Sequence, residues 1–246
     1  MSWAFKTVRQ SGIHRSGGAF PALLAIALWS TSGVVSAVAA EKVIQVEGQQ
    51  RTDPAMITKV TLGSAELQCG VVVSPREVQP VTPFQAGDDW IENLTLYLFN
   101  RTDKTITFAN IRIGFPEIGD GSSQRPMRSD YITLGRIPPA VAFSASTGQP
   151  LRQSARRKAM TFPPGQLLLI DVGTYANSIK GSVDSMPFAS ITKITIQVSS
   201  VYFDDGMKWN GEYYAPDPEH PGKFTRLDGN YFPGDMRLNW PPGYRK

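Results

Sequence analysis

The feature that most constrains this chain is a two-residue repeat of apolar side chains, which begins at Val43 and continues through most of the sequence. Within residues 90–99, for example, one face of an extended chain carries Leu94, Leu96 and Leu98. Successive side chains of a β-strand point to opposite faces, whereas a helix repeats its apolar face about every 3.6 residues. The sequence therefore predicts strands that each bury one face.

Residues 90–99 and 105–115 are predicted to pair as a β-hairpin, because the polar segment 100–104 between them is typical of a turn. The alternation in the second strand changes phase at Ala109 and Asn110. One inserted residue produces such a change, so we expect a β-bulge near Ala109.

Six further segments have strand character, at residues 43–47, 57–62, 67–73, 131–137, 166–172 and 191–203. The last leads to Asp205 and Gly206, a dipeptide typical of a two-residue hairpin turn, which places Trp209 on a returning strand. Many short strands, turns that contain Pro and Gly, and no convincing amphipathic helix favour an all-β fold. We expect two antiparallel sheets packed face to face over residues 41–209.

The segment 210–246 differs from the rest, because it combines frequent prolines with a high density of aromatic residues. Disordered tails are usually poor in aromatics. We therefore expect an irregular C-terminal segment that packs on the sandwich through its rings, within a single domain.

Residues 1–40 have the order of a secretory signal. Lys6, Arg9 and Arg15 precede an uncharged stretch with an apolar centre, and small residues follow. Cleavage is expected before Ala40 or Glu41. The alternative is an uncleaved membrane anchor, and in both cases the remainder is expected to be exported to the periplasm or the extracellular space.

Charge gives no support for nucleic-acid binding. Residues 1–40 hold three of the 25 basic and none of the 21 acidic residues, so the mature chain has 22 basic against 21 acidic side chains and a formal charge of +1. Nucleic-acid binding requires a clustered basic surface. One local cluster remains, at Arg152, Arg156, Arg157 and Lys158, and we interpret it as a solvated loop, with an anionic surface or polymer as the alternative.

Few residues are suited to catalysis or metal binding. The single cysteine, Cys69, cannot form an internal disulfide and is interpreted as a small buried residue. His220 is the only histidine outside residues 1–40, and it lies in a Pro-flanked loop without a nucleophile motif. The aspartates lack the spacing of a calcium loop and are typical of turns. We expect no catalytic residue, no metal and no cofactor.

The stretch WIENLTLYLFNRTDKTITFANIRIGFPE, residues 90–117, resembles paired strands of exported bacterial proteins with an immunoglobulin-like or fibronectin-III-like sandwich. The segments FPPGQLLLIDV and VYFDDGMKW resemble parts of the same uncharacterised proteins. The resemblance implies an immunoglobulin-like architecture and carries no shared catalytic residues. The Cys-Trp-Cys pattern of antibody domains is not present.

Three functions are compatible with these observations. The first is a non-catalytic, exported module that binds a protein or glycan partner in the envelope or extracellular space through its surface. The second is a carbohydrate-binding module, in which aromatic side chains stack on sugar rings. Its candidate ligand-binding residues are Trp209, Tyr213, Tyr214 and Trp240. The third is a small hydrolase that uses two carboxylates.

Overall fold

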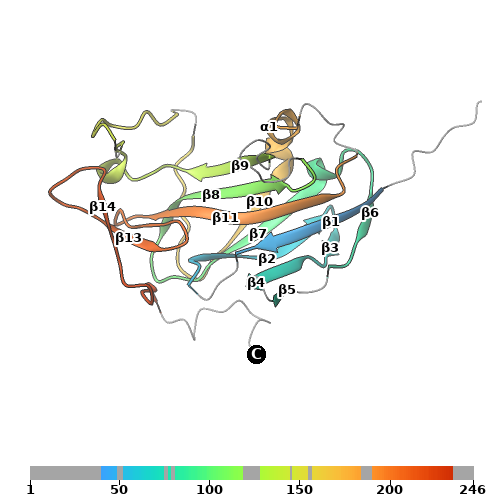
Figure 1. Ribbon diagram of the computed structural model, residues 1–246, viewed down its shortest axis with the longest axis horizontal. Coiled ribbons are helices and arrows are strands. Elements are labelled where there is room, and N and C mark those ends of the chain that lie inside the picture. The colour runs from blue at the N-terminus through green and yellow to red at the C-terminus, as the bar shows by residue number, and fades with distance from the viewer. Residues whose placement is uncertain are drawn as a thin grey trace, which may run out of the picture. The chain divides into compact units, whose positions relative to one another are not determined.

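The computed structural model describes residues 40–48, 52–74, 77–78, 81–118, 128–144, 146–154, 157–183 and 190–234. The predicted signal lies outside this part of the chain except for Ala40, which is the first residue of strand β1. The described part is mostly β and forms two sheets (Figure 1), as the alternation predicts. Within it, no helix is long and apolar enough to cross a membrane.

Ten of the described strands form the large sheet. In chain order they are β1 (Ala40–Glu47), β4 (Gly70–Ser74), β5 (Glu77–Val78), β6 (Phe84–Ala86), β8 (Ile106–Phe115), β9 (Arg128–Gly135), β11 (Lys193–Phe203), β12 (Lys208–Trp209), β13 (Tyr213–Pro216) and β14 (Phe224–Arg226). Strand β11 is the hub of this sheet, because it pairs with β8 along one side and with β1 and β12 along the other.

The small sheet is antiparallel and has the strand order β10 (Leu167–Asp171), β7 (Leu94–Asn100), β2 (Ala55–Leu62) and β3 (Ala65–Leu67). Its inner face carries the three leucines of β7, all fully buried. They belong to one hydrophobic core that also contains Ile111 and Ile113 of β8 and Ile194 and Ile196 of β11. The period-two prediction for these strands is therefore confirmed.

The large sheet is mixed, which corrects the expectation that both sheets are antiparallel. Strand β1 runs parallel to β11, with Val43 opposite Lys193, and parallel to β4, with Gln45 opposite Gly70. Parallel strands need long connections, and sequence periodicity does not reveal which distant strand is the partner.

The predicted hairpin between residues 90–99 and 105–115 is wrong, because β7 and β8 belong to different sheets. The polar segment between them crosses from one sheet to the other, and Asn100, Arg101 and Thr102 are fully buried in it. The Asn100 side-chain amide donates to the carbonyls of Lys104 and Phe162, at 2.8 and 2.9 Å. Internal hydrogen bonds thus satisfy the Asn100 side-chain amide, in a segment whose composition is that of a surface turn.

The pairing of β8 with β11 is irregular at two places, one on each side of the bulge predicted near Ala109: Ser199 is an extra residue of β11 opposite Asn110 and Ile111, and Thr107 is an extra residue of β8. Phe108 pairs with Tyr202 and Ile106 with Phe203, so Thr107 is the extra residue. Its carbonyl accepts a hydrogen bond from the Arg136 amide at 3.1 Å and lies where a side chain on Gly135 would be. Gly135 has φ +70°, a backbone conformation that glycine adopts without strain.

Two other strand predictions need adjustment. The run 67–73 is divided between β3 and β4, which belong to different sheets, so residues 68–69 form the corner of the sandwich. The hairpin from β11 to β12 is present and carries Trp209 on its returning strand. Its loop has three residues, closed by a hydrogen bond from the Phe203 amide to the Met207 carbonyl at 2.9 Å, with Gly206 at φ +86°.

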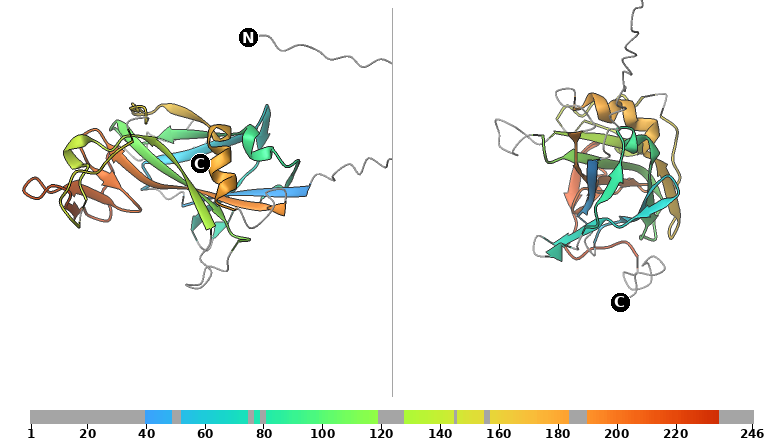
Figure 2. Two further views of the ribbon diagram at one scale, coloured as in Figure 1. Left: turned by 90° about the horizontal axis from the view of Figure 1, so that it is seen from above. Right: turned by 90° about the vertical axis from the view of Figure 1, so that its right-hand side faces the viewer.

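Short helices cover part of the sandwich. Within the described ranges, three are 3-10 helices, η1 (Trp90–Asn93), η2 (Pro139–Val141) and η3 (Val172–Tyr175), and one is the α-helix α1 (Ala176–Gly181). The η1 helix occupies the start of a predicted strand. Figures 1 and 2 show α1 beside the edge of the sheets near β9.

The C-terminal segment is more regular than expected. Strands β13 and β14 extend the large sheet beyond β12 as successive antiparallel partners. Residues 227–234 then continue without strand or helix, and residues 235–246 lie outside the described part of the chain.

Candidate functional site

The aromatic residues proposed to bind sugar do not form one exposed surface. Trp209 and Tyr213 face each other across β12 and β13, and both rings are buried, with exposed fractions of 4% and 3%. Tyr214 follows Tyr213 directly in the strand and therefore points to the opposite face, where the Lys208 ammonium lies 5.2 Å from its ring centre. Trp240 lies outside the described residues.

Tyr213 instead connects three segments of the chain. Its hydroxyl donates to the Thr52 carbonyl at 2.9 Å, and its ring stacks on Phe203 with centres 6.2 Å apart. Tyr231 and Phe232 make edge contacts with it, at 5.4 and 6.3 Å between centres. Burial raises the pKa of the phenol well above its usual range. These contacts describe a packing residue rather than a ligand platform.

A fully buried arginine lies beside this aromatic cluster, and the sequence reasoning did not anticipate it. The Arg101 guanidinium donates to the Asp53 carbonyl at 3.3 Å and lies 5.5 Å from the Phe232 ring centre. Burial lowers the pKa of Arg101, and the nearby Asp53 carboxylate opposes that shift. The sequence predicts that Arg101 lies in a polar turn, because composition alone does not distinguish a buried crossing from an exposed loop.

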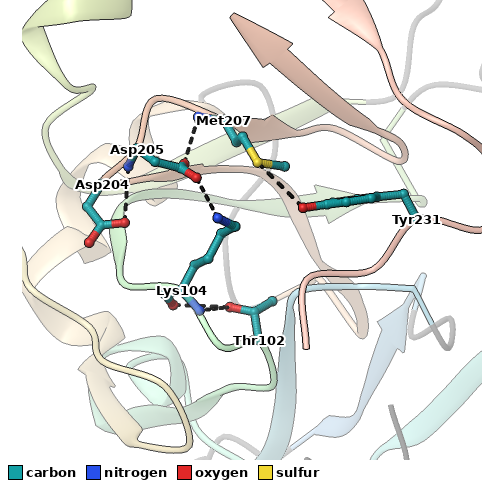
Figure 3. A network of polar contacts seen from close by, with 6 residues as sticks. All are labelled: Thr102, Lys104, Asp204, Asp205, Met207 and Tyr231. Atoms are coloured by element: carbon teal, nitrogen blue, oxygen red, sulfur yellow. Dashed lines mark hydrogen bonds and ion pairs between the residues drawn. The ribbon is translucent and has the colours of Figure 1, made fainter. Parts of the chain in front are cut away.

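A second set of contacts joins the β11–β12 hairpin both to Lys104 and to the C-terminal segment (Figure 3). The Lys104 ammonium lies 2.6 Å from one Asp205 carboxylate oxygen, and the other accepts the Met207 amide at 3.0 Å. The Tyr231 hydroxyl reaches the Met207 sulfur at 3.7 Å. Asp204 accepts the Asp205 amide at 3.0 Å, as expected for an aspartate in a turn.

A cavity of about 510 Å³ lies at the corner of the sandwich, and we call it the inter-sheet cavity. Its aliphatic walls come from both sheets: Val46 and Val71 from the large sheet, and Ile57, Val60 and Leu67 from the small sheet. Thr58, Lys59, Glu66, Gln68 and Cys69 complete the lining. The volume lies within the range of about 300–1,000 Å³ that is usual for small-molecule sites.

The polar groups of this cavity are already paired. The Lys59 ammonium is 2.9 Å from the Glu66 carboxylate, and their hydrogen bond raises the pKa of Lys59. The Gln68 side-chain carbonyl accepts a hydrogen bond from the Thr82 hydroxyl at 2.9 Å. The rim therefore has no net charge to attract an ion.

Cys69 contributes an uncharged thiol to the same cavity. Burial raises its pKa to about 12, so the thiolate that reacts with electrophiles is scarce at neutral pH. Cys69 is only partly buried and packs against the edge of the core, so it is less enclosed than the small buried residue that the sequence predicts. What the sequence did not reveal is the cavity, whose only signal is the sharp break between β3 and β4 at Gln68 and Cys69.

The remaining candidates lie away from this cavity. The His220 ring nitrogen Nδ1 is 2.9 Å from an Asp217 carboxylate oxygen, but both residues belong to an exposed turn. Arg152, Arg157 and Lys158 are exposed, and Arg156 is outside the described residues. Among the residues with described positions, no group of three or more His, Cys, Asp or Glu could hold a metal ion.

Comparison with known proteins found no family model, no curated protein and no solved structure that matches this chain.

Proposed function

We propose that this chain is an exported, non-catalytic β-sandwich protein that holds an uncharged aliphatic molecule in the inter-sheet cavity. The observation that carries the proposal is a cavity of about 510 Å³ with five aliphatic side chains in its walls, opening between two sheets. The proposal includes a location in the periplasm or outside the cell. It also includes the immunoglobulin-like architecture that residues 90–117 resemble, with the parallel pairing of β1 as a departure from it.

The aliphatic side chains of the cavity walls favour an aliphatic ligand. Micromolar affinity corresponds to about 8 kcal/mol, and each buried methylene group contributes about 0.8 kcal/mol. A ligand with a chain of about ten carbons, or one of similar apolar size, would therefore be required. The neutral thiol of Cys69 is compatible with such a ligand, because it behaves as a small apolar group.

The ion pair between Lys59 and Glu66 at the rim of the cavity favours an uncharged ligand. A carboxylate or ammonium group inside the cavity would lose its hydration without gaining a free partner, because Lys59 and Glu66 already neutralise each other. The same pairing argues against hydrolysis. Glu66 is the only carboxylate in the described lining, whereas the carboxylate mechanism needs two, one of them as a general acid or base.

Binding of N-phenyl-1-naphthylamine, an uncharged fluorophore, tests the proposal. The purified protein should give a saturable increase in fluorescence, and 1-decanol should displace the dye. Val71→Phe would place a larger ring in the cavity and should weaken binding at least about tenfold, the change expected from about 1.4 kcal/mol. Leu169→Phe is the matched control, because Leu169 is 60% exposed on the outer face of β10, and it should leave binding unchanged.

A second readout avoids substitution altogether. Cys69 is the single cysteine of the chain and lines the cavity, so bound 1-decanol should slow its alkylation by N-ethylmaleimide. The proposal fails if the dye does not saturate, if Val71→Phe binds as well as the wild type, or if decanol leaves the alkylation rate unchanged.

A further inference from the structure

Strand β10 forms one edge of the small sheet, and no described strand pairs with its outer side. The strand order places β7 beside it on one side only, with Leu167 opposite Phe99 and Asp171 opposite Thr95. Among the described backbone groups, none outside β7 forms a hydrogen bond with residues 167–170. An edge strand of this kind presents unpaired N–H and C=O groups, which can pair with a strand of another chain.

The first hydrogen bond of the ladder shows which backbone groups are unpaired. The Asn100 amide donates to the Gln166 carbonyl at 3.1 Å, so the backbone groups of Gln166 face β7. In an antiparallel pair, only every second residue of a strand forms hydrogen bonds with the same neighbour. The N–H and C=O groups of Leu167 and Leu169 therefore point to the open edge.

The side chains of the same two leucines are exposed. Leu167 is 47% and Leu169 is 60% exposed, which is unusual for large apolar side chains in the described part of the chain. The residues between and after them turn inward, because Leu168 packs against the core and Ile170 is buried. Each exposed leucine thus offers an apolar side chain together with an unpaired N–H and C=O.

Charged side chains protect other terminal strands, but not β10. Strand β3, at the other end of the small sheet, carries Glu66, whose carboxylate lies 2.9 Å from the Lys59 ammonium. Strand β14, at one end of the large sheet, carries Arg226, which is 2.5 Å from a Glu212 carboxylate oxygen. Charges on an edge strand hinder pairing with another chain. The only charged residue of β10 is its last, Asp171, and its carboxylate caps the η3 helix.

From these observations we propose that β10 pairs with β10 of a second copy of this chain, in antiparallel orientation about a two-fold axis at Leu168. In this register, Leu167 lies opposite Leu169 of the second copy, and Leu169 lies opposite Leu167 of the second copy. Each of the two pairs exchanges two N–H···O=C bonds, so the unpaired groups of both strands satisfy each other. The leucine side chains of both copies then meet on the outer face.

The spacing of the two leucines favours a second copy over an unrelated strand. Because the unpaired groups and the exposed side chains belong to residues two apart, the edge is complementary to itself, as a two-fold dimer requires. A register centred on Leu169 would instead place Leu167 opposite Asp171. The contact is limited by the five-residue length of β10. Interfaces below about 1,200 Å² are typical of transient complexes, so the dimer should be weak and reversible.

Sedimentation velocity of the purified protein, from about 10 µM to about 1 mM, tests for the dimer. The weight-average mass should rise with concentration toward twice that of the monomer. Leu169→Lys places a charge on the edge of both copies and should weaken association at least about tenfold. Leu151→Lys is the matched control, because Leu151 is 42% exposed and lies outside β10, and it should associate as the wild type does.

Amide hydrogen exchange measured by NMR tests the register without any substitution. The Leu168 and Ile170 amides are bonded to β7 and should exchange slowly at every protein concentration. The Leu167 and Leu169 amides should exchange rapidly in dilute protein and more slowly as the dimer forms.

A mass that stays monomeric up to about 1 mM, or undiminished association of Leu169→Lys, overturns the proposal. Leu167 and Leu169 amides that exchange slowly at every concentration also overturn it, because another segment of the same chain would then cover the edge. Val71→Phe should dimerise as the wild type does while losing the naphthylamine dye, because β10 contributes no residue to the inter-sheet cavity. Failure of the dimer is therefore distinguishable from failure of the cavity.

Discussion

Replacement of Tyr213 distinguishes a structural role from a ligand-binding role for the C-terminal aromatic residues. Tyr213→Phe removes only the hydrogen bond to the Thr52 carbonyl. One such bond contributes about 1 kcal/mol, so we expect this variant to unfold about 2–4 °C lower than the wild type. Tyr213→Ala also removes the ring, which contacts Phe203, Tyr231 and Phe232.

Loss of a buried aromatic ring costs about 3–5 kcal/mol, so Tyr213→Ala should unfold roughly 6–20 °C lower. Tyr214→Ala is the matched control, because Tyr214 is only half-buried on the opposite face, and it should cost less than Tyr213→Ala. Urea unfolding monitored by both far-UV circular dichroism and tryptophan fluorescence measures the free energies and checks that the transitions coincide. Equal losses for Tyr213→Ala and Tyr214→Ala would refute the structural role.

The pH dependence of the same variants gives an independent check. Burial raises the pKa of Tyr213 above the value of about 10 that it has in the unfolded chain. The folded state therefore keeps a proton that the unfolded state releases, and stability falls as the pH rises above about 10. Tyr213→Phe cannot ionise, so its stability should fall less steeply between pH 9.5 and pH 11 (roughly the range around the tyrosine pKa) than that of the wild type.

Three further predictions concern single positions. Gly135→Ala should cost more than about 2 kcal/mol in urea unfolding, because it combines a positive φ with a clash against backbone. Cys69 should react with iodoacetamide more slowly than free cysteine at pH 8, and urea should abolish the difference, since burial raises its pKa to about 12. Arg101→Ala should cost about 3–5 kcal/mol because it removes a fully buried cation that interacts with the Asp53 carboxylate. Lys104→Ala should cost less than about 1 kcal/mol, because its ion pair is partly exposed.

The local structure could be predicted from the sequence to a large extent, whereas the connections between strands could not. Leu94, Leu96 and Leu98 define the inner face of β7 by their spacing alone. That β7 and β8 pair with other strands depends on Arg101 and its neighbours being buried, and a polar segment of that composition is usually on the surface. The parallel pairing of β1 with β11 joins residues too far apart for any periodicity to reveal.

Part of the candidate site could also be predicted from the sequence. Tyr213 and Tyr214 are consecutive in a strand and must point to opposite faces, so they could not both belong to one platform. Burial of Trp209 could not be inferred, because it depends on the position of β12 at the end of β1. The sequence does not predict the inter-sheet cavity either, because the cavity arises where the two sheets separate, at the corner between Leu67 and Gly70.

The position of β1 has a consequence for how the molecule acquires its structure. This strand is the first of the described elements, yet it sits inside the large sheet with β4 on one side and β11, about 150 residues later, on the other. Non-local pairing of this kind slows folding, because the entropy of closing a long loop is lost before the contacts form. The sheet therefore stays open until residues 193–196 have been synthesised, and a chain that ends before them should remain sensitive to proteases.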